Sequence, residues 1–208
     1  MSAVVNITVN APPPGSGEVT LQEGVNGYAG AQDTYLNIWF ANSSQGGSES
    51  NRDRTNQYQT LMRFDVFSDE DGPVPVGSQI QAATLSLYKS SAYDHVYGLH
   101  RVLRDWRDTE ATWNQARIGV PWAEAGASGL DTDIAATADA TGSTGWSSGW
   151  IDFDVTDAVQ AMSDGADNYG WKLVGVSGNR NTKQFYSGDY TGDSSLRPRL
   201  TIQYSSAP

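Results

Sequence analysis

The chain has 208 residues and carries 24 acidic against 13 basic side chains, a formal net charge of −11 at pH 7. A nucleic-acid-binding surface needs a basic stripe, and a membrane span needs about 18 consecutive apolar residues; the sequence has neither, which argues against both kinds of partner. There is no cysteine, which excludes a disulfide framework, a thiolate metal site and a cysteine nucleophile.

The first 17 residues are expected to lie outside the folded module. Val4–Asn10 alternates apolar and polar residues, as the last strand of a preceding β-domain would, and Ala11–Gly17 has the proline, glycine and serine content of a linker. The alternative is an ordinary N-terminal arm. Residues 205–208 have the composition of a second linker. The sequence therefore predicts one module over residues 18–204, covalently joined to neighbouring domains.

From Val19 onward, short runs rich in Val, Ile, Thr, Tyr and Trp recur between turns that contain Gly or Pro, which is typical of β-strands. In one run Met62, Phe64 and Val66 alternate with polar residues, so they share a face. The predicted strands are Val19–Gln22, Asp33–Phe40, Thr60–Val66, Gln79–Tyr88, Tyr97–Leu103, residues 151–154, Tyr169–Val176, Gln184–Ser187 and Arg199–Tyr204.

One helix is predicted near residue 156. Thr156 suits its N-cap, Val159 and Met162 follow at helical spacing, and Gly165 is placed to end it. Residues 114–148 show little β-alternation and predict a long, partly ordered excursion, a feature that is often functional. Many strands, one short helix and long loops predict an all-β fold, specifically a jelly-roll β-sandwich.

Few residues suit catalysis. The two histidines, His95 and His100, lie in or beside a predicted strand, and no Gly-x-Ser-x-Gly elbow accompanies them, so a hydrolase triad is not indicated. Asp152 and Asp154 share one face of a strand, as an acid pair would, but a solvent-facing position and a place beside the helix cap explain them more simply. We therefore expect no enzymatic activity.

Three aspartates are candidate ligands for one structural calcium ion. Asp33 lies at a strand start, and Asp131 and Asp133 lie in an oxygen-rich part of the excursion, where carboxylates could bind this hard cation. Residues 69–72 begin like an EF-hand loop, but the twelfth position is Ile80, so that match fails. An ordinary solvated turn explains each aspartate equally well.

Aromatic side chains are the main remaining signal. The seven Trp and ten Tyr residues exceed what a core of this size needs, and flat rings stack on the apolar faces of sugars. Trp113, Trp150, Trp171 and Phe185 are assigned to the core. The predicted ligand-binding residues are the aromatic side chains Tyr28, Trp39, Tyr93, Tyr97, Trp122 and Trp146, together with the basic side chains Arg52, Arg54 and His95.

Five short phrases of the sequence, in order along the chain, form a recognisable pattern. They are Leu61–Asp65, Ala82–Tyr88, Ala111–Asn114, Asn168–Trp171 and Arg197–Leu200. Together they are similar to the DNRLRE domain, also classed as carbohydrate-binding module family 96 and related to the disaggregatase repeat, over roughly Val19 to Tyr204. The literal name motif is absent, and Asp189 stands where the family pattern has Glu.

The resemblance implies a jelly-roll module of a large secreted or cell-surface bacterial or archaeal protein that binds an alginate-type polysaccharide without catalysis. A net charge of −11 opposes a polyanionic ligand unless cations such as Arg180 and Lys183 gather locally or calcium bridges protein and polymer. A neutral glycan bound by aromatic rings is equally consistent. The alternative function is a structural or adhesive spacer without sugar specificity. We expect an extracellular monomer.

Overall fold

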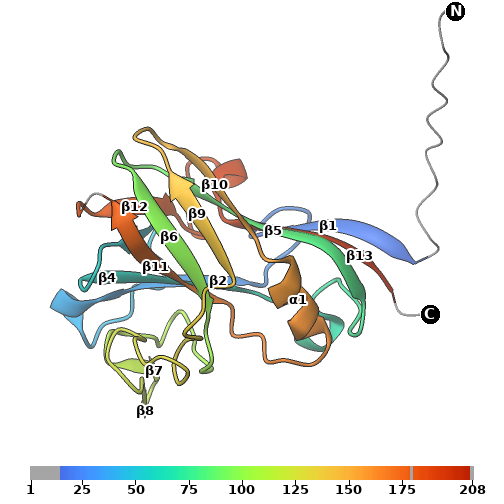
Figure 1. Cartoon of the computed structure of the whole chain (residues 1–208), viewed down its shortest axis with the longest axis horizontal. Helices are drawn as coiled ribbons and strands as arrows, with labels where there is room; N and C mark the ends of the chain where they lie inside the picture. The colour runs from blue at the N-terminus through green and yellow to red at the C-terminus, as the bar shows by residue number, and fades with distance from the viewer. Residues whose placement is uncertain (1–14, 179, 207–208) are drawn as a thin grey trace, which may run out of the picture.

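The computed structural model describes residues 15–178 and 180–206, which form a sandwich of two antiparallel sheets (Figure 1). Sheet A contains β1 (Ser16–Gln22), β13 (Arg199–Ser205), β5 (Gln79–Lys89), β12 (Lys183–Tyr186), β3 (Ser50–Asp53) and β10 (Gly149–Asp154). Sheet B contains, in spatial order, β2 (Ala31–Asn37), β4 (Tyr58–Phe64), β11 (Trp171–Gly178), β6 (His95–Arg101) and β9 (Ala140–Thr144).

The predicted all-β sandwich with a short helix is confirmed. Successive strands alternate between the sheets from β2 to β6, so the chain winds around one core as in a jelly roll. Because side chains alternate across a strand, Met62 and Phe64 on β4 face Leu85 and Leu87 of the other sheet, and all four are buried. Val66, just after β4, is buried with them, as predicted.

Residues 114–148 are better ordered than their sequence suggests. They contain β7 (Gln115–Arg117), β8 (Val120–Pro121) and β9, and the segment with β7 and β8 lies at the bottom of Figure 1. Together with residues 102–113 they enclose a second hydrophobic core that also takes in Leu36 and Leu61 of sheet B. Trp106 is fully buried there, and its indole N–H donates to the Tyr169 carbonyl at 2.8 Å.

The helix α1 spans Thr156–Ser163. The prediction that Thr156 is its N-cap is wrong by one position, because Thr156 is the first helical residue and Val155 precedes it as the cap. Asp154 supplies the acceptor: its Oδ1 accepts from the Thr156 amide at 3.1 Å and hydroxyl at 2.7 Å. Gly165 follows the helix with φ +105°, as expected of its terminator. No helix in the described ranges is long and apolar enough to cross a membrane.

Several strand boundaries differ from prediction. The strand predicted over Asp33–Phe40 ends at Asn37, whose side chain accepts from the Trp39 amide at 3.0 Å and so starts the 3₁₀ turn η1 (Ile38–Phe40). Two more 3₁₀ turns are η2 (Ser68–Glu70) and η3 (Ser194–Leu196). The short strands β3 and β9 have no clear apolar alternation, so sequence reasoning missed them.

The two ends of the described chain lie side by side on the right of Figure 1. Ser16 of β1 pairs with Ser205 of β13, which also pairs with Gln79 at the start of β5. The predicted strand at Val4–Asn10 and most of the predicted linker lie outside the described residues. The opposite end of β5, at Lys89, marks the other end of the sandwich.

Replacing Trp106 by Ala tests the second core. We expect the free energy of unfolding to fall by about 3–5 kcal/mol, because the change leaves a cavity and an unpaired Tyr169 carbonyl. Urea denaturation measures it. The matched control is Ile118→Ala in the same segment, a side chain that is 76% exposed and should leave the stability nearly unchanged. A similar small effect in both variants would contradict the second core.

Candidate functional site

Five chain segments meet at the end of the sandwich that is opposite to the chain ends. We call this surface the loop end and define it by residues 38–40, 54–57, 90–94, 145–148 and 180–182, which follow β2, β3, β5, β9 and β11. The strand register brings them together, because His95 pairs with both Gly178 and Thr144 at this edge of sheet B. The loop end lies on the left of Figure 1.

Exposed aromatic rings concentrate at the loop end. Among the described residues, all the strongly exposed aromatic side chains lie there: Trp39 (68%), Phe40 (62%), Trp146 (63%) and Tyr93 (36%). Large aromatic side chains are usually well buried, so four exposed ones on a single surface indicate a contact surface. The predictions for Trp39, Tyr93 and Trp146 named three of these four.

The Tyr93 and Trp146 loops are held together from behind. Their rings are in edge contact with centroids 6.2 Å apart, and the Tyr93 amide donates to the Trp146 carbonyl at 3.2 Å. The buried ammonium of Lys89 donates to the Tyr93 carbonyl at 2.7 Å and to the Gly145 carbonyl. Tyr93 has φ +79°, which is rare for a bulky residue and persists because the surroundings hold it.

A groove of about 640 Å³ opens at the loop end, lined by the β3–β4 turn, the end of β11 and His95. It brings together Arg54 and His95, both predicted as ligand contacts, with Arg180. Gly175 is needed in its wall, because a Cβ at this position would lie 2.4 Å from His95 Nε2. The groove is therefore shaped around the imidazole ring.

The arginines of the loop end, and Arg52 just before it in β3, differ from most others in the chain. Arg52, Arg54 and Arg180 form no ion pair within residues 15–178 and 180–206, although acidic side chains outnumber basic ones nearly two to one. The Arg52 guanidinium lies over the Tyr35 ring, 5.4 Å from its centroid. Arginines that pair with a carboxylate are Arg63, Arg101, Arg104, Arg107 and Arg117, all away from the loop end.

Beneath the groove lies a buried polar cluster. Lys183 Nζ is 3.1 Å from His95 Nδ1, and because an ammonium can only donate, Nδ1 accepts and the neutral ring carries its proton on Nε2, beside Gly175. Burial lowers the pKa of Lys183, and nearby Asp53 opposes this. Burial raises the pKa of Asp53 to about 7, against the attraction of Lys172 and Lys183. The cluster therefore fixes the orientation of the His95 ring through its Nδ1 atom.

Two of the predicted aromatic contacts are buried instead of exposed at the loop end. Tyr97 is fully buried in the main core, and Trp122 is 5% exposed, with its indole N–H donating to the Thr112 carbonyl at 2.9 Å. Neither ring has a face open to a ligand. Their burial depends on the tertiary structure, in which the main core encloses Tyr97 and the second core encloses Trp122.

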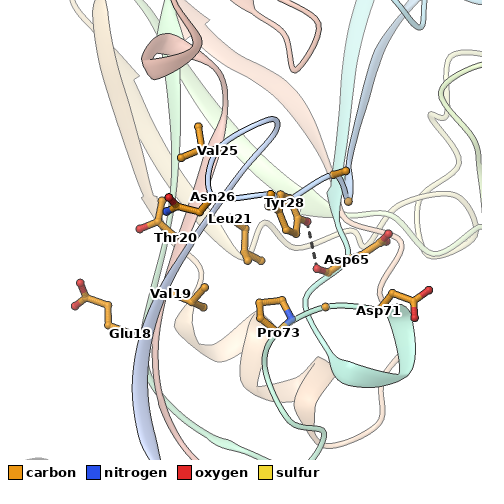
Figure 2. Close-up of a pocket in the computed structure, with 14 residues that line it drawn as sticks. Glu18, Val19, Thr20, Leu21, Val25, Asn26, Tyr28, Asp65, Asp71 and Pro73 are labelled. Atoms are coloured by element: carbon orange, nitrogen blue, oxygen red, sulfur yellow. Dashed lines mark hydrogen bonds between the residues drawn. The ribbon is translucent and has the colours of Figure 1, made fainter.

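Tyr28 lines a different pocket of about 670 Å³ at the other end of sheet B (Figure 2). Its hydroxyl donates to the Asp65 carbonyl at 3.2 Å, the bond dashed in Figure 2, and burial raises its pKa. The carboxylates of Glu18, Asp65 and Asp71 surround this pocket, so its charge is opposite to that of the groove. Tyr28 therefore does not contribute to the loop end.

The three predicted calcium ligands do not share a site. Asp33 accepts from the Asn51 side chain at 2.6 Å and the Gly188 amide at 2.7 Å, whereas Asp131 lies exposed in the excursion. Asp133 is fully buried and accepts from Arg104 and from the amides of residues 123, 124 and 129. The described residues include no group of three or more His, Cys, Asp or Glu side chains arranged for a metal.

Sequence reasoning missed Phe40 and did not place Arg180 among the site residues. Phe40 was assigned to a strand, although Asn37 three residues earlier is a good cap for a turn. Arg180 and Lys183 stood out as a basic pair in an acidic chain, but the strand pairing of Lys183 with Asp53 was needed to bring them beside Arg54.

Residues 49–202 match the family model described as the disaggregatase related repeat domain. The chain belongs to this family. The match runs from β3 to β13 and confirms this part of the sequence resemblance. Within the repeat domain, Arg54, His95, Trp146 and Arg180 of the loop end lie inside the matched range, whereas Trp39 precedes it. No curated protein matches the chain.

The buried carboxyl beneath the groove makes stability depend on pH. Between about pH 4 and pH 7 the unfolded chain releases the Asp53 proton while the folded chain, with a pKa of about 7, keeps it, so this group lowers stability as pH rises. We expect Asp53→Asn to lose less stability than the wild type between these two pH values, as measured by urea denaturation. Parallel pH profiles for the two proteins would contradict the assignment.

Proposed function

We propose that this disaggregatase-related repeat domain is a non-catalytic, monomeric polysaccharide-binding module of a larger secreted or cell-surface protein, as in the DNRLRE or family 96 modules, and that its ligand is an acidic, alginate-like glycan. The observation that carries the proposal is that unpaired arginines in a groove and exposed aromatic rings occur together at one end of the sandwich. A sugar acid needs both kinds of contact, one for its carboxylate and one for its ring.

The groove can supply the polar contacts. The guanidinium groups of Arg54 and Arg180 carry fork-shaped donors that match a carboxylate, and no carboxylate of the described chain occupies them. The His95 side chain lines the same space, with its Nε2 buried beside Gly175. The net charge of −11 is no obstacle, because the charges within a few ångströms of the ligand decide its binding.

The exposed aromatic rings do not line the groove, but two of them follow the outer strands of the sheet that carries it. In sheet B, the turn with Trp39 follows the outer strand β2, and the loop with Trp146 follows the opposite outer strand β9. The groove lies over the strands between them. An extended glycan could therefore place a charged unit at Arg54 and Arg180 while its neighbouring units stack on the two tryptophans.

The position of the chain ends supports a tethering role. Ser16 and Ser205 pair at the end of the sandwich remote from the groove, so domains joined there would leave the groove uncovered. Binding through such a module raises the local concentration of its covalently linked partners at the polymer.

The contacts of the acid–base residues support a role without catalysis. His100 Nδ1 is 2.8 Å from the Ala135 carbonyl, Asp152 accepts from the Ser86 hydroxyl at 2.6 Å, and Asp154 is bonded to the first residue of α1. Each of these groups has a structural partner, and none of them lines the groove.

Affinity electrophoresis in alginate-containing gels tests the proposal. The wild type should be retarded, and less so at higher salt, because screening weakens contacts between exposed charges. Arg54→Ala and Arg180→Ala should each weaken binding about tenfold or more, since a hydrogen bond to a charged group contributes about 1.5–3 kcal/mol. Gels with neutral glucan or xylan, and added calcium or chelator, separate ligand charge from metal bridging.

Arg107→Ala is the matched control, because the Arg107 side chain is 60% exposed but pairs with Glu110 away from the groove. It should bind like the wild type. If no polysaccharide retards the wild type in any gel, the binding role is wrong and a structural or adhesive spacer becomes the function. Equal losses in all three variants would show nonspecific attraction.

A further inference from the structure

The outward face of sheet A carries a second group of aromatic side chains. On three neighbouring strands the residues next in line point into the core, namely Ile151, Leu87 and Phe185, so Trp150, Tyr88 and Tyr186 must point away from it. All three outward rings are partly exposed. The sequence-based assignment of Trp150 to the core is therefore wrong, because strand alternation turns its ring to the outer face of sheet A. A solvent-facing sheet surface is usually polar, so this cluster of rings requires an explanation.

The rings form one continuous row. The centroids of Trp150 and Tyr88 are 5.3 Å apart in edge contact, and Tyr88 and Tyr186 are parallel at 5.7 Å. Tyr190, from the loop after β12, stacks on Tyr186 with centroids 3.7 Å apart, and its carbonyl accepts from Arg197 Nε at 2.8 Å. The row is therefore held in place by sheet pairing at one end and by an anchored loop at the other.

Arg199 of β13 lies at the Trp150 end of the row. Its guanidinium carbon is 4.2 Å from the centre of a Trp150 ring, close enough for a cation–π contact. Stacking fixes the plane of the guanidinium and leaves the edge, which carries the N–H donors, free for a flat anion. Within the described ranges Arg199 pairs with no carboxylate, although Asp152 lies on the same face.

We propose that Arg199, fixed on Trp150, and the adjoining row of tyrosines form a second binding site, separate from the groove, for the carboxylate and ring of a uronic acid unit. The occupant follows from charge and shape: a preorganised, unpaired guanidinium selects a planar anion, and the tyrosine edges and hydroxyls beside it fit a hydroxylated ring. The identity of the polymer rests on the proposed function, but none of these residues lines the groove.

Two sites on different surfaces would change how the module binds. One chain could contact both sites, or two polymer chains could be joined by one module. Either arrangement raises the apparent affinity for long polymers above that for short ones, because the second contact becomes intramolecular.

Calorimetric titration with a mannuronate trisaccharide, too short to link distant sites, tests the inference. We expect two binding events per wild-type chain and one in Arg199→Lys, which keeps the charge but loses the planar fork. The double variant Arg54→Ala/Arg180→Ala should retain one event, and Arg107→Lys, a change at an ion-paired arginine, should retain two.

A measurement on the wild type does not depend on whether the variants fold correctly. The Nε–H signal of Arg199 in a ¹⁵N NMR spectrum, assigned by its absence from Arg199→Lys, should shift as the trisaccharide is added. An unmoved signal, or two events remaining in Arg199→Lys, would overturn the second site while leaving the groove intact. Loss of all binding in Arg199→Lys with full binding in the groove variant would instead refute the groove.

Discussion

The long strand β5 is the constraint on which the rest of the molecule depends. Along one edge of this 11-residue strand, Gln79–Ser86 pair with β13 and Lys89 pairs with β12. Along the other edge, Thr84–Lys89 pair with β10. This single strand therefore separates the paired chain ends, at Gln79, from the loop end, at Lys89. The two ends of the described chain and the loop end therefore lie at opposite ends of the sandwich.

The loop end is held together by buried charge rather than by apolar packing. Lys89 joins two loops through their carbonyls, and Lys183 supports His95 while facing the buried Asp53. Burying these ammonium groups is costly in free energy, and their hydrogen bonds offset that cost only in one arrangement of the loops. For the proposed binding role, loops fixed in this way would lose less entropy when a ligand binds.

Several elements of the candidate site could be predicted, and the reasons differ. Trp146 lies among glycine and serine residues, so its exposure could be predicted from local sequence, whereas Trp39 lies in the apolar run Ile38–Ala41 and its exposure depends on the turn that follows β2. Tyr97 and Trp122 were predicted to be ligand contacts, yet they are buried, because the opposite sheet covers Tyr97 and residues 102–134 cover Trp122. Asp133 looked like a metal ligand, but its oxygens accept from amides and an arginine that lie up to 29 residues away.

The sequence by itself determined the all-β class, most strand positions, the helix and the family, because alternation, turn residues and short phrases are local properties of the chain. Only the tertiary structure decided which cations remain without a carboxylate and which rings stay exposed. Those outcomes depend on strand register, since the pairing of Lys183 with Asp53 brings Arg180 to Arg54, and the pairing of Trp150 with Tyr88 across from Arg199 builds the second surface. Register is set by the whole core, which no single stretch of sequence contains.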